Sequence, residues 1–153
     1  MWRGITAEGE AEYNQWHTRE HMPERLVIPG FLVGRRSVDW SLDRHRYFTS
    51  YAGRTLEVFR SEAYLARLNA PTAWSERIQP HFRNFIRAAC ETVHTSGHGI
   101  TSLDGVTAVH VGITHPTITS VRTRETDPRD GVEATGGRRG LRCNHPRRRH
   151  WTP

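Results

Sequence analysis

Residues 13–31, YNQWHTREHMPERLVIPGF, carry the pattern from which the fold is predicted. Side chains with rings or carboxylates recur here at three- and four-residue intervals, which is typical of one side of a helix. We predict a helix over residues 7–22, with Thr6 as its N-cap and glutamates in its first turns. Pro23 disfavours helical geometry at Met22, so we expect the helix to end there. The residues on the predicted helix side are Tyr13, Trp16, His17, Glu20 and His21.

The segments on either side of this helix predict strands. Residues 2–6 form a short apolar start that suits an edge strand. After a Pro-Gly turn, residues 31–40 and 47–52 are rich in β-favouring side chains. They predict a hairpin, in which Gly34 is expected to mark a bulge.

Two further helical segments and a strand complete the predicted domain. Residues 61–68 predict a helix capped by Ser61, and residues 74–78 predict a short helical turn. Either a helix or a strand suits the next apolar stretch, and we favour a strand over residues 86–93. The order of strand, helix, strand, strand, helix and strand indicates an α+β domain over residues 1–95.

The positive charge is concentrated near the end of the chain. All 22 basic residues are arginine. Residues 1–121 hold 13 Arg against 12 acidic residues, for a net +1, whereas residues 122–153 hold 9 against 4, for +5. We predict that residues 122–153 are a disordered tail and that residues 96–121 are an extension or the start of an incomplete second unit. The run Arg147-Arg148-Arg149 supports non-specific attraction to nucleic acid at most.

The chain is expected to be a cytoplasmic protein. No run approaches the roughly 18 apolar residues of a membrane span. The first residues lack the apolar core and cleavage site of a signal peptide. Cys90 and Cys143 lie in unlike contexts and do not form a disulfide framework, which suits a reducing compartment.

Several segments resemble the EthD-like branch of the dimeric α+β barrel superfamily. Members commonly carry a His-Pro step or near variant, and a Pro-Gly before the second strand. Here His21-Met22-Pro23 and Pro29-Gly30-Phe31 occupy those places. The likeness covers about residues 1–95, and the matching segments are residues 13–25, 28–31, 35–36, 47–51, 64–68 and 71–72, together with Trp74.

The resemblance implies a ferredoxin-like βαββαβ unit that pairs with a second copy as a homodimeric α+β barrel. It also implies a pocket between the sheet and the helices. A bare apolar sheet face independently favours a dimer, because such a face is a liability in a monomer. Related chains often carry two units in tandem. A second unit would begin near Gly97 here, so we hypothesise a truncation or reading-frame change after about Gly99.

Histidines suggest two metal-dependent alternatives, neither of which we favour. His17-Thr18-Arg19-Glu20-His21 matches the H-x-x-E-H pattern of some zinc proteases, which also need an acidic ligand from a later helix. Glu91, the nearest candidate, lies in a predicted strand. Some α+β barrels bind haem through histidine, but five of the ten histidines lie beyond the predicted domain. We therefore predict no metal and no cofactor.

Proton transfer by His21 is the catalytic hypothesis. Histidine titrates near neutrality, and His17 and Glu20 lie where they could orient its ring. Alternatively, the aromatic residues form the core or a dimer seam and His21 only hydrogen-bonds a carbonyl. Under the catalytic hypothesis the pocket is walled by Trp16, Tyr47, Tyr51 and Trp74, and Arg35 or Arg36 holds an anionic group.

The sequence therefore predicts a homodimeric protein with a pocket for a small hydrophobic or aromatic compound. It does not specify a reaction. The alternative is a non-catalytic module that dimerises and holds a ligand.

Overall fold

The computed structural model describes residues 1–97, 108–121 and 123–124. Within them, helices and strands are mixed, which confirms the α+β class. The strands are β1 (Trp2–Ile5), β2 (Phe31–Val38), β3 (Tyr47–Gly53), β4 (Phe82–Ile86), β5 (Cys90–Gly97) and β6 (Ala108–Thr114). The α-helices are α1 (Glu10–Trp16), α2 (Met22–Leu26), α3 (Glu62–Asn69), α4 (Ala73–Ile78) and α5 (Pro116–Thr119), with 3₁₀ turns at Leu56–Arg60 and Gln79–His81.

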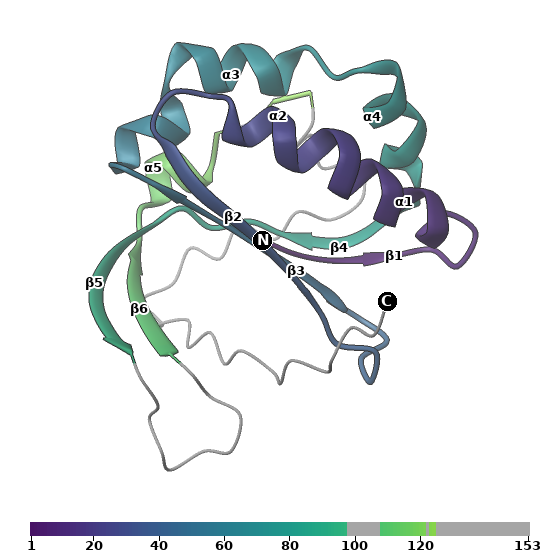
Figure 1. Cartoon of the computed structure of the whole chain (residues 1–153), viewed down its shortest axis with the longest axis horizontal. Coiled ribbons are helices and arrows are strands. Elements are labelled where there is room, and N and C mark those ends of the chain that lie inside the picture. The colour runs from purple at the N-terminus through teal and green to yellow at the C-terminus, as the bar shows by residue number, and fades with distance from the viewer. Residues whose placement is uncertain (98–107, 122, 125–153) are drawn as a thin grey trace.

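A four-stranded antiparallel sheet has the order β2-β3-β1-β4. Helices α1 to α4 lie over one face of it (Figure 1). The prediction that β1 is an edge strand is wrong, because β3 and β4 pair with its two sides. A strand's own residues do not reveal how many neighbours it has, and both neighbours of β1 come later in the chain.

The first helix runs past Pro23, contrary to the prediction. Helices α1 and α2 are joined by a π-helical turn at His17–His21, in which the Met22 N–H donates to the His17 carbonyl. Pro23 then lies in the first turn of α2, where an N–H has no partner within the helix anyway. The wider π-helical turn thus allows the helical segment to continue through Pro23. The predicted N-cap is also displaced: α1 begins after Gly9, whose N–H donates to the Thr6 hydroxyl over a long 3.4 Å, while the same hydroxyl lies 2.8 Å from His81 Nδ1.

The β2–β3 hairpin is confirmed, but its irregularity is not at Gly34. The register shifts between Phe31 and Val33, next to the turn. Gly34 instead allows close packing, because a Cβ built there would lie 2.3 Å from Met22 Sδ. The Met22 side chain of α2 therefore packs directly against the β2 backbone at Gly34.

Two apolar clusters fill the space between the helices and the sheet. One is built from Tyr13, Trp16, Tyr47 and Ile78, all of them buried. The other is built from Ile28, Phe31, Tyr64 and Leu68. The second cluster holds α3, whose predicted cap is confirmed: the Ser61 side chain accepts from the Tyr64 N–H.

The stretch after α4 differs from the predicted strand over residues 86–93. Strand β4 ends at Ile86, and β5 begins a separate two-stranded sheet with β6. Between them, the Ala89 N–H donates to Thr119 Oγ1, so residues 87–89 are held by the α5 segment rather than by a strand. This dependence on a segment 30 residues away is invisible in local periodicity.

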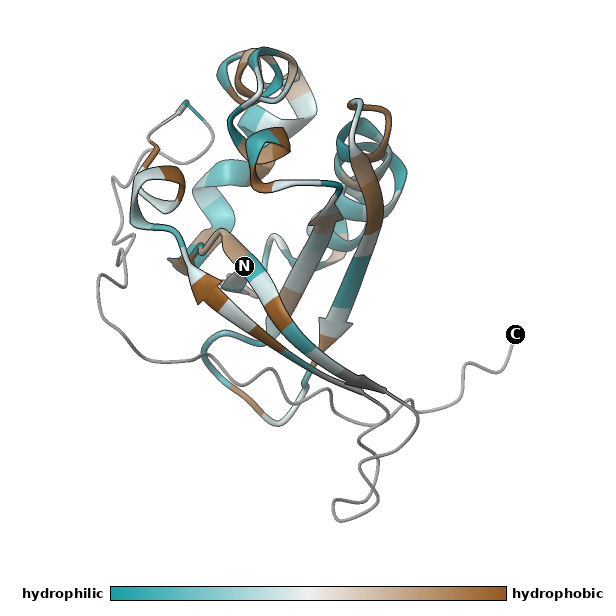
Figure 2. Ribbon diagram, turned by 90° about the vertical axis from the view of Figure 1, so that its left-hand side faces the viewer, coloured by the Kyte–Doolittle hydropathy of each residue, from teal (hydrophilic) through white to brown (hydrophobic). Residues whose placement is uncertain are grey.

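The β5–β6 hairpin lies on the side of the four-stranded sheet away from α1 to α4 (Figures 1 and 2). Strand β5 crosses position 95, where the first domain is predicted to end. Most of the predicted tail and Cys143 lie outside the described residues, as do residues 98–107 of the predicted second unit.

Candidate functional site

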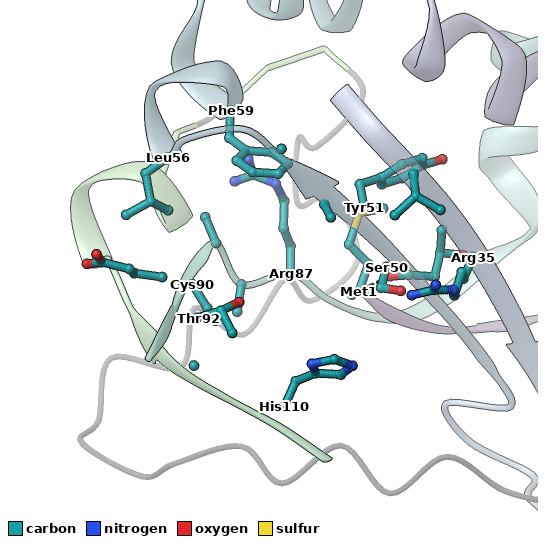
Figure 3. Close-up of a pocket in the computed structure, with 18 of the residues that line it drawn as sticks. Met1, Arg35, Ser50, Tyr51, Leu56, Phe59, Arg87, Cys90, Thr92 and His110 are labelled. Atoms are coloured by element: carbon teal, nitrogen blue, oxygen red, sulfur yellow. Dashed lines mark hydrogen bonds between the residues drawn. The ribbon is translucent and has the colours of Figure 1, made fainter. Parts of the chain in front are cut away.

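A pocket of about 750 Å³ lies between the sheet and the start of the β5–β6 hairpin (Figure 3). Its walls come from β2 and β3, from residues 54–59 after β3, and from residues 87–92. His110 and Gly112 of β6 border it as well. The pocket thus depends on a hairpin that is remote in sequence from the four-stranded sheet.

The alternation of side chains along β3 decides what faces this pocket. Phe48 and Ser50 line the pocket, whereas Tyr47 is buried beneath the helices. Thr49 also borders the pocket, but its hydroxyl bonds to His17 on the helix side. On the neighbouring β1, Trp2 packs against Phe48 with ring centroids 4.5 Å apart. The sheet side of the pocket therefore offers an aromatic surface.

Charged side chains border the same space. Arg35, Arg54 and Arg87 line the pocket, together with Glu57 and Glu91. Glu57 is ion-paired with Arg60 outside the lining, and Glu91 Oε2 lies 3.7 Å from His115 Nε2. Figure 3 shows Arg35 and Arg87 approaching the pocket from different elements.

Arg87 is the buried member of this group. Its exposed fraction is 6 %, and its Nη1 donates to the carbonyls of Ile118 (3.0 Å) and Thr119 (3.1 Å) at the end of α5. These two bonds fix the plane of the guanidinium at the pocket wall. Sequence analysis missed Arg87 because no local pattern distinguishes it from the other arginines.

His17 and His21 are buried beneath the sheet's helical layer and are not part of the lining of this pocket. His17 Nε2 lies 3.1 Å from Thr49 Oγ1, and the two imidazole centroids are 5.1 Å apart. Burial, assisted by the Arg3 guanidinium, lowers the pKa of His17 from 6.5 to about 2. Burial likewise holds the pKa of His21 well below 6.5, with Arg25 and His17 adding to the effect. Both rings are therefore neutral at neutral pH.

Glu20 contacts α4 rather than a histidine in the interactions the structure shows. Its Oε1 accepts hydrogen bonds from Trp16 Nε1 (3.1 Å) and from the hydroxyls of Thr72 and Ser75. Thr72 caps α4 through its own side chain. The carboxylate thus links the π-helical turn to α4. It was predicted instead to orient the His21 ring.

The remaining predicted site residues divide between core and pocket. Trp16 and Tyr47 are core residues, and Trp74 packs against their cluster. Arg35 and Tyr51 line the pocket, which lies beside the β5–β6 hairpin rather than between the sheet and the helices as predicted. Tyr51 also has its ring centroid 6.3 Å from that of His21, so it borders both regions. Arg36 points to the helices, where it donates to Thr18 Oγ1 at 3.2 Å.

In the described part of the chain, no group of three or more His, Cys, Asp or Glu side chains is arranged to hold a metal ion. The H-x-x-E-H residues do not act together, since Glu20 bonds to Trp16 and to the start of α4, whereas the two histidine rings contact each other at a tilt of 48°. Across the same residues, none of the helices has the length and apolar character that a bilayer crossing requires.

The chain matches no protein-family model, and neither a curated protein nor a solved structure matches it. The function is therefore argued from the geometry of the pocket.

Proposed function

We propose that this protein binds a small hydrophobic or aromatic compound in the pocket between the four-stranded sheet and the β5–β6 hairpin. The observation that carries this proposal is the cavity of about 750 Å³ beside the Trp2–Phe48 ring pair. Pockets for small molecules are commonly about 300–1,000 Å³ in volume and are lined by apolar and aromatic side chains. A flat ring stacked on this surface would bury apolar area on both sides.

We further propose that residues 2–86 form a ferredoxin-like βαββαβ unit that pairs with a second copy as a dimeric α+β barrel. The antiparallel order β2-β3-β1-β4, with helices on one face, supports this. The cytoplasmic location stays a prediction, in keeping with a free thiol at Cys90.

Binding without catalysis suits the geometry better than proton transfer by His21. A neutral, buried imidazole that does not border the pocket is poorly placed to exchange protons with a ligand there. The catalytic alternative depends on Tyr51, which lines the pocket and lies near His21. A ligand that changes the ¹⁵N shifts of the His21 ring would favour that alternative.

The test is to fill the pocket. Small neutral aromatics, beginning with naphthalene-2-carboxamide, are titrated into the ¹⁵N-labelled full chain. We expect amide shifts at pocket residues such as Phe48 and Ser50. Ser50→Trp, which places an indole in the cavity, should weaken binding about 10-fold or more, because it occupies the ligand's volume.

Ala66→Trp is the matched control, since Ala66 is exposed on α3 outside the pocket lining. It should leave affinity unchanged. Equal binding by the wild type and a folded Ser50→Trp variant would contradict the proposed site.

A further inference from the structure

The arginines of the pocket lack carboxylate partners among the described residues. No ion pair joins Arg35, Arg54 or Arg87 to a described Asp or Glu. Of the two lining glutamates, Glu57 is already ion-paired with Arg60, which lies outside the lining. Three arginines against two glutamates therefore leave the described lining with an excess of positive charge.

Arg87 makes this excess costly where it is buried. A guanidinium has five N–H donors, and in Arg87 the described partners of these donors are the two carbonyls bound by Nη1. Nε and Nη2 of Arg87 have no hydrogen-bond partner among the described residues. A buried cation without a counter-charge is unfavourable, and an anion in the pocket would relieve it.

Arg3 is a second buried arginine, and it lies outside the pocket lining. Its exposed fraction is 4 %, and its guanidinium carbon lies 4.3 Å from the Phe82 ring centroid and 4.7 Å from that of Phe85. Cation–π contacts thus stabilise Arg3 within the core. No ring contact of this kind is found for Arg87 in the described chain, although Phe59 lines the same pocket.

We propose that the pocket selects amphipathic anions, in which an aromatic or aliphatic body lies on Trp2 and Phe48 and a carboxylate is held by Arg87. This inference rests on the proposed function and specifies its ligand class. The planar guanidinium suits a carboxylate because two N–H groups can bind its two oxygens side by side. Arg35 and Arg54, which are exposed at the pocket wall, add attraction at longer range.

A matched pair of probes tests the proposal by calorimetry on the full chain at pH 7.5. The probes are 2-naphthoate and naphthalene-2-carboxamide, which have nearly the same shape but differ by one negative charge. We expect 2-naphthoate to bind about 10-fold more tightly or better, since hydrogen bonds to charged groups are stronger than neutral ones. This preference should shrink as salt is raised.

Arg87→Gln should reduce the preference for 2-naphthoate to about twofold or less. Arg83→Gln is the control: Arg83 is exposed on β4, outside the lining, and donates only to nearby carbonyls in the described structure. Because Arg87 also holds α5, the exposed double variant Arg35→Gln/Arg54→Gln provides a second test. It should lower the preference without a change in melting temperature.

Each outcome decides something. Equal affinities for the two probes would overturn the anion proposal and leave the proposed small-molecule function standing. A preference for 2-naphthoate that survives both Arg87→Gln and the double variant would also overturn it. Binding of neither probe at millimolar concentration would overturn both proposals.

Discussion

His17 and His21 are neutral core residues whose burial makes folding sensitive to acid. In the unfolded chain each would bind a proton near its ordinary pKa of 6.5, whereas in the folded protein the pKa of His17 is about 2 and that of His21 is well below 6.5. As the pH falls below about 6.5, the unfolded state therefore binds protons that the folded state does not. Stability conferred by these rings is present above that pH and is lost below it.

We predict that the free energy of unfolding declines steeply between pH 6 and pH 5. Two such groups impose a limiting slope of about 2.7 kcal/mol per pH unit. His17→Gln should remove about half of the slope, as measured by urea unfolding at each pH. His94→Gln, at an exposed position on β5, should change it little. A flat profile from pH 7 to pH 5 would show that the imidazoles titrate alike in both states.

Contacts between elements depend on small residues as well as on the aromatic clusters. Gly34 lies where α2 meets β2, and a Cβ there would also come within 2.9 Å of the Tyr51 ring. By contrast, a Cβ at Gly4 in β1 would make ordinary contacts, the nearest at 3.6 Å from Arg83. The two glycines thus differ in the space around them.

Gly34→Ala should destabilise the protein by about 1–3 kcal/mol, because the methyl group overlaps the Met22 side chain and the Tyr51 ring, both of which must move. Gly4→Ala should be near neutral in the same denaturant titration. Adding Met22→Ala to Gly34→Ala should recover part of the loss, since it removes the sulfur that the methyl group meets. If the double variant recovers no stability, the Met22 side chain is not what the new methyl group collides with.

At the scale of the whole molecule, strand β2 is an edge of the four-stranded sheet and pairs only with β3 among the described strands. Leu32 on this strand is 59 % exposed. Open edges and exposed apolar side chains are typical of surfaces that pair with another chain. This supports the proposed homodimer.

Sedimentation equilibrium at micromolar concentration should therefore give twice the mass of the 153-residue chain. Leu32→Glu should shift the equilibrium towards monomer by introducing a charge at the interface. Val27→Glu, at an exposed position just after α2, is the matched control and should not. A wild-type monomer at tens of micromolar would contradict the dimer.

The sequence by itself determined the α+β class, the β2–β3 hairpin and the Ser61 cap, because each depends on residues close together in the chain. Arg35 and Tyr51, which the sequence assigned to a pocket between the sheet and the helices, border instead the pocket beside the β5–β6 hairpin. Local periodicity showed that Trp16 and His21 share a helix side, but not that this side is sealed in the core.

Only the tertiary structure decided where the pocket lies and which arginine is buried in it. Arg87 donates to carbonyls more than 30 residues away in the sequence. The β5–β6 hairpin lies beside the sheet face that the helices leave uncovered, and there it helps to form the pocket. Burial and pairing between distant segments are properties of the folded chain, so no window of sequence contains them. The same reason explains why β1 is a central strand, and why the pKa values of His17 and His21 are low enough to keep both rings neutral.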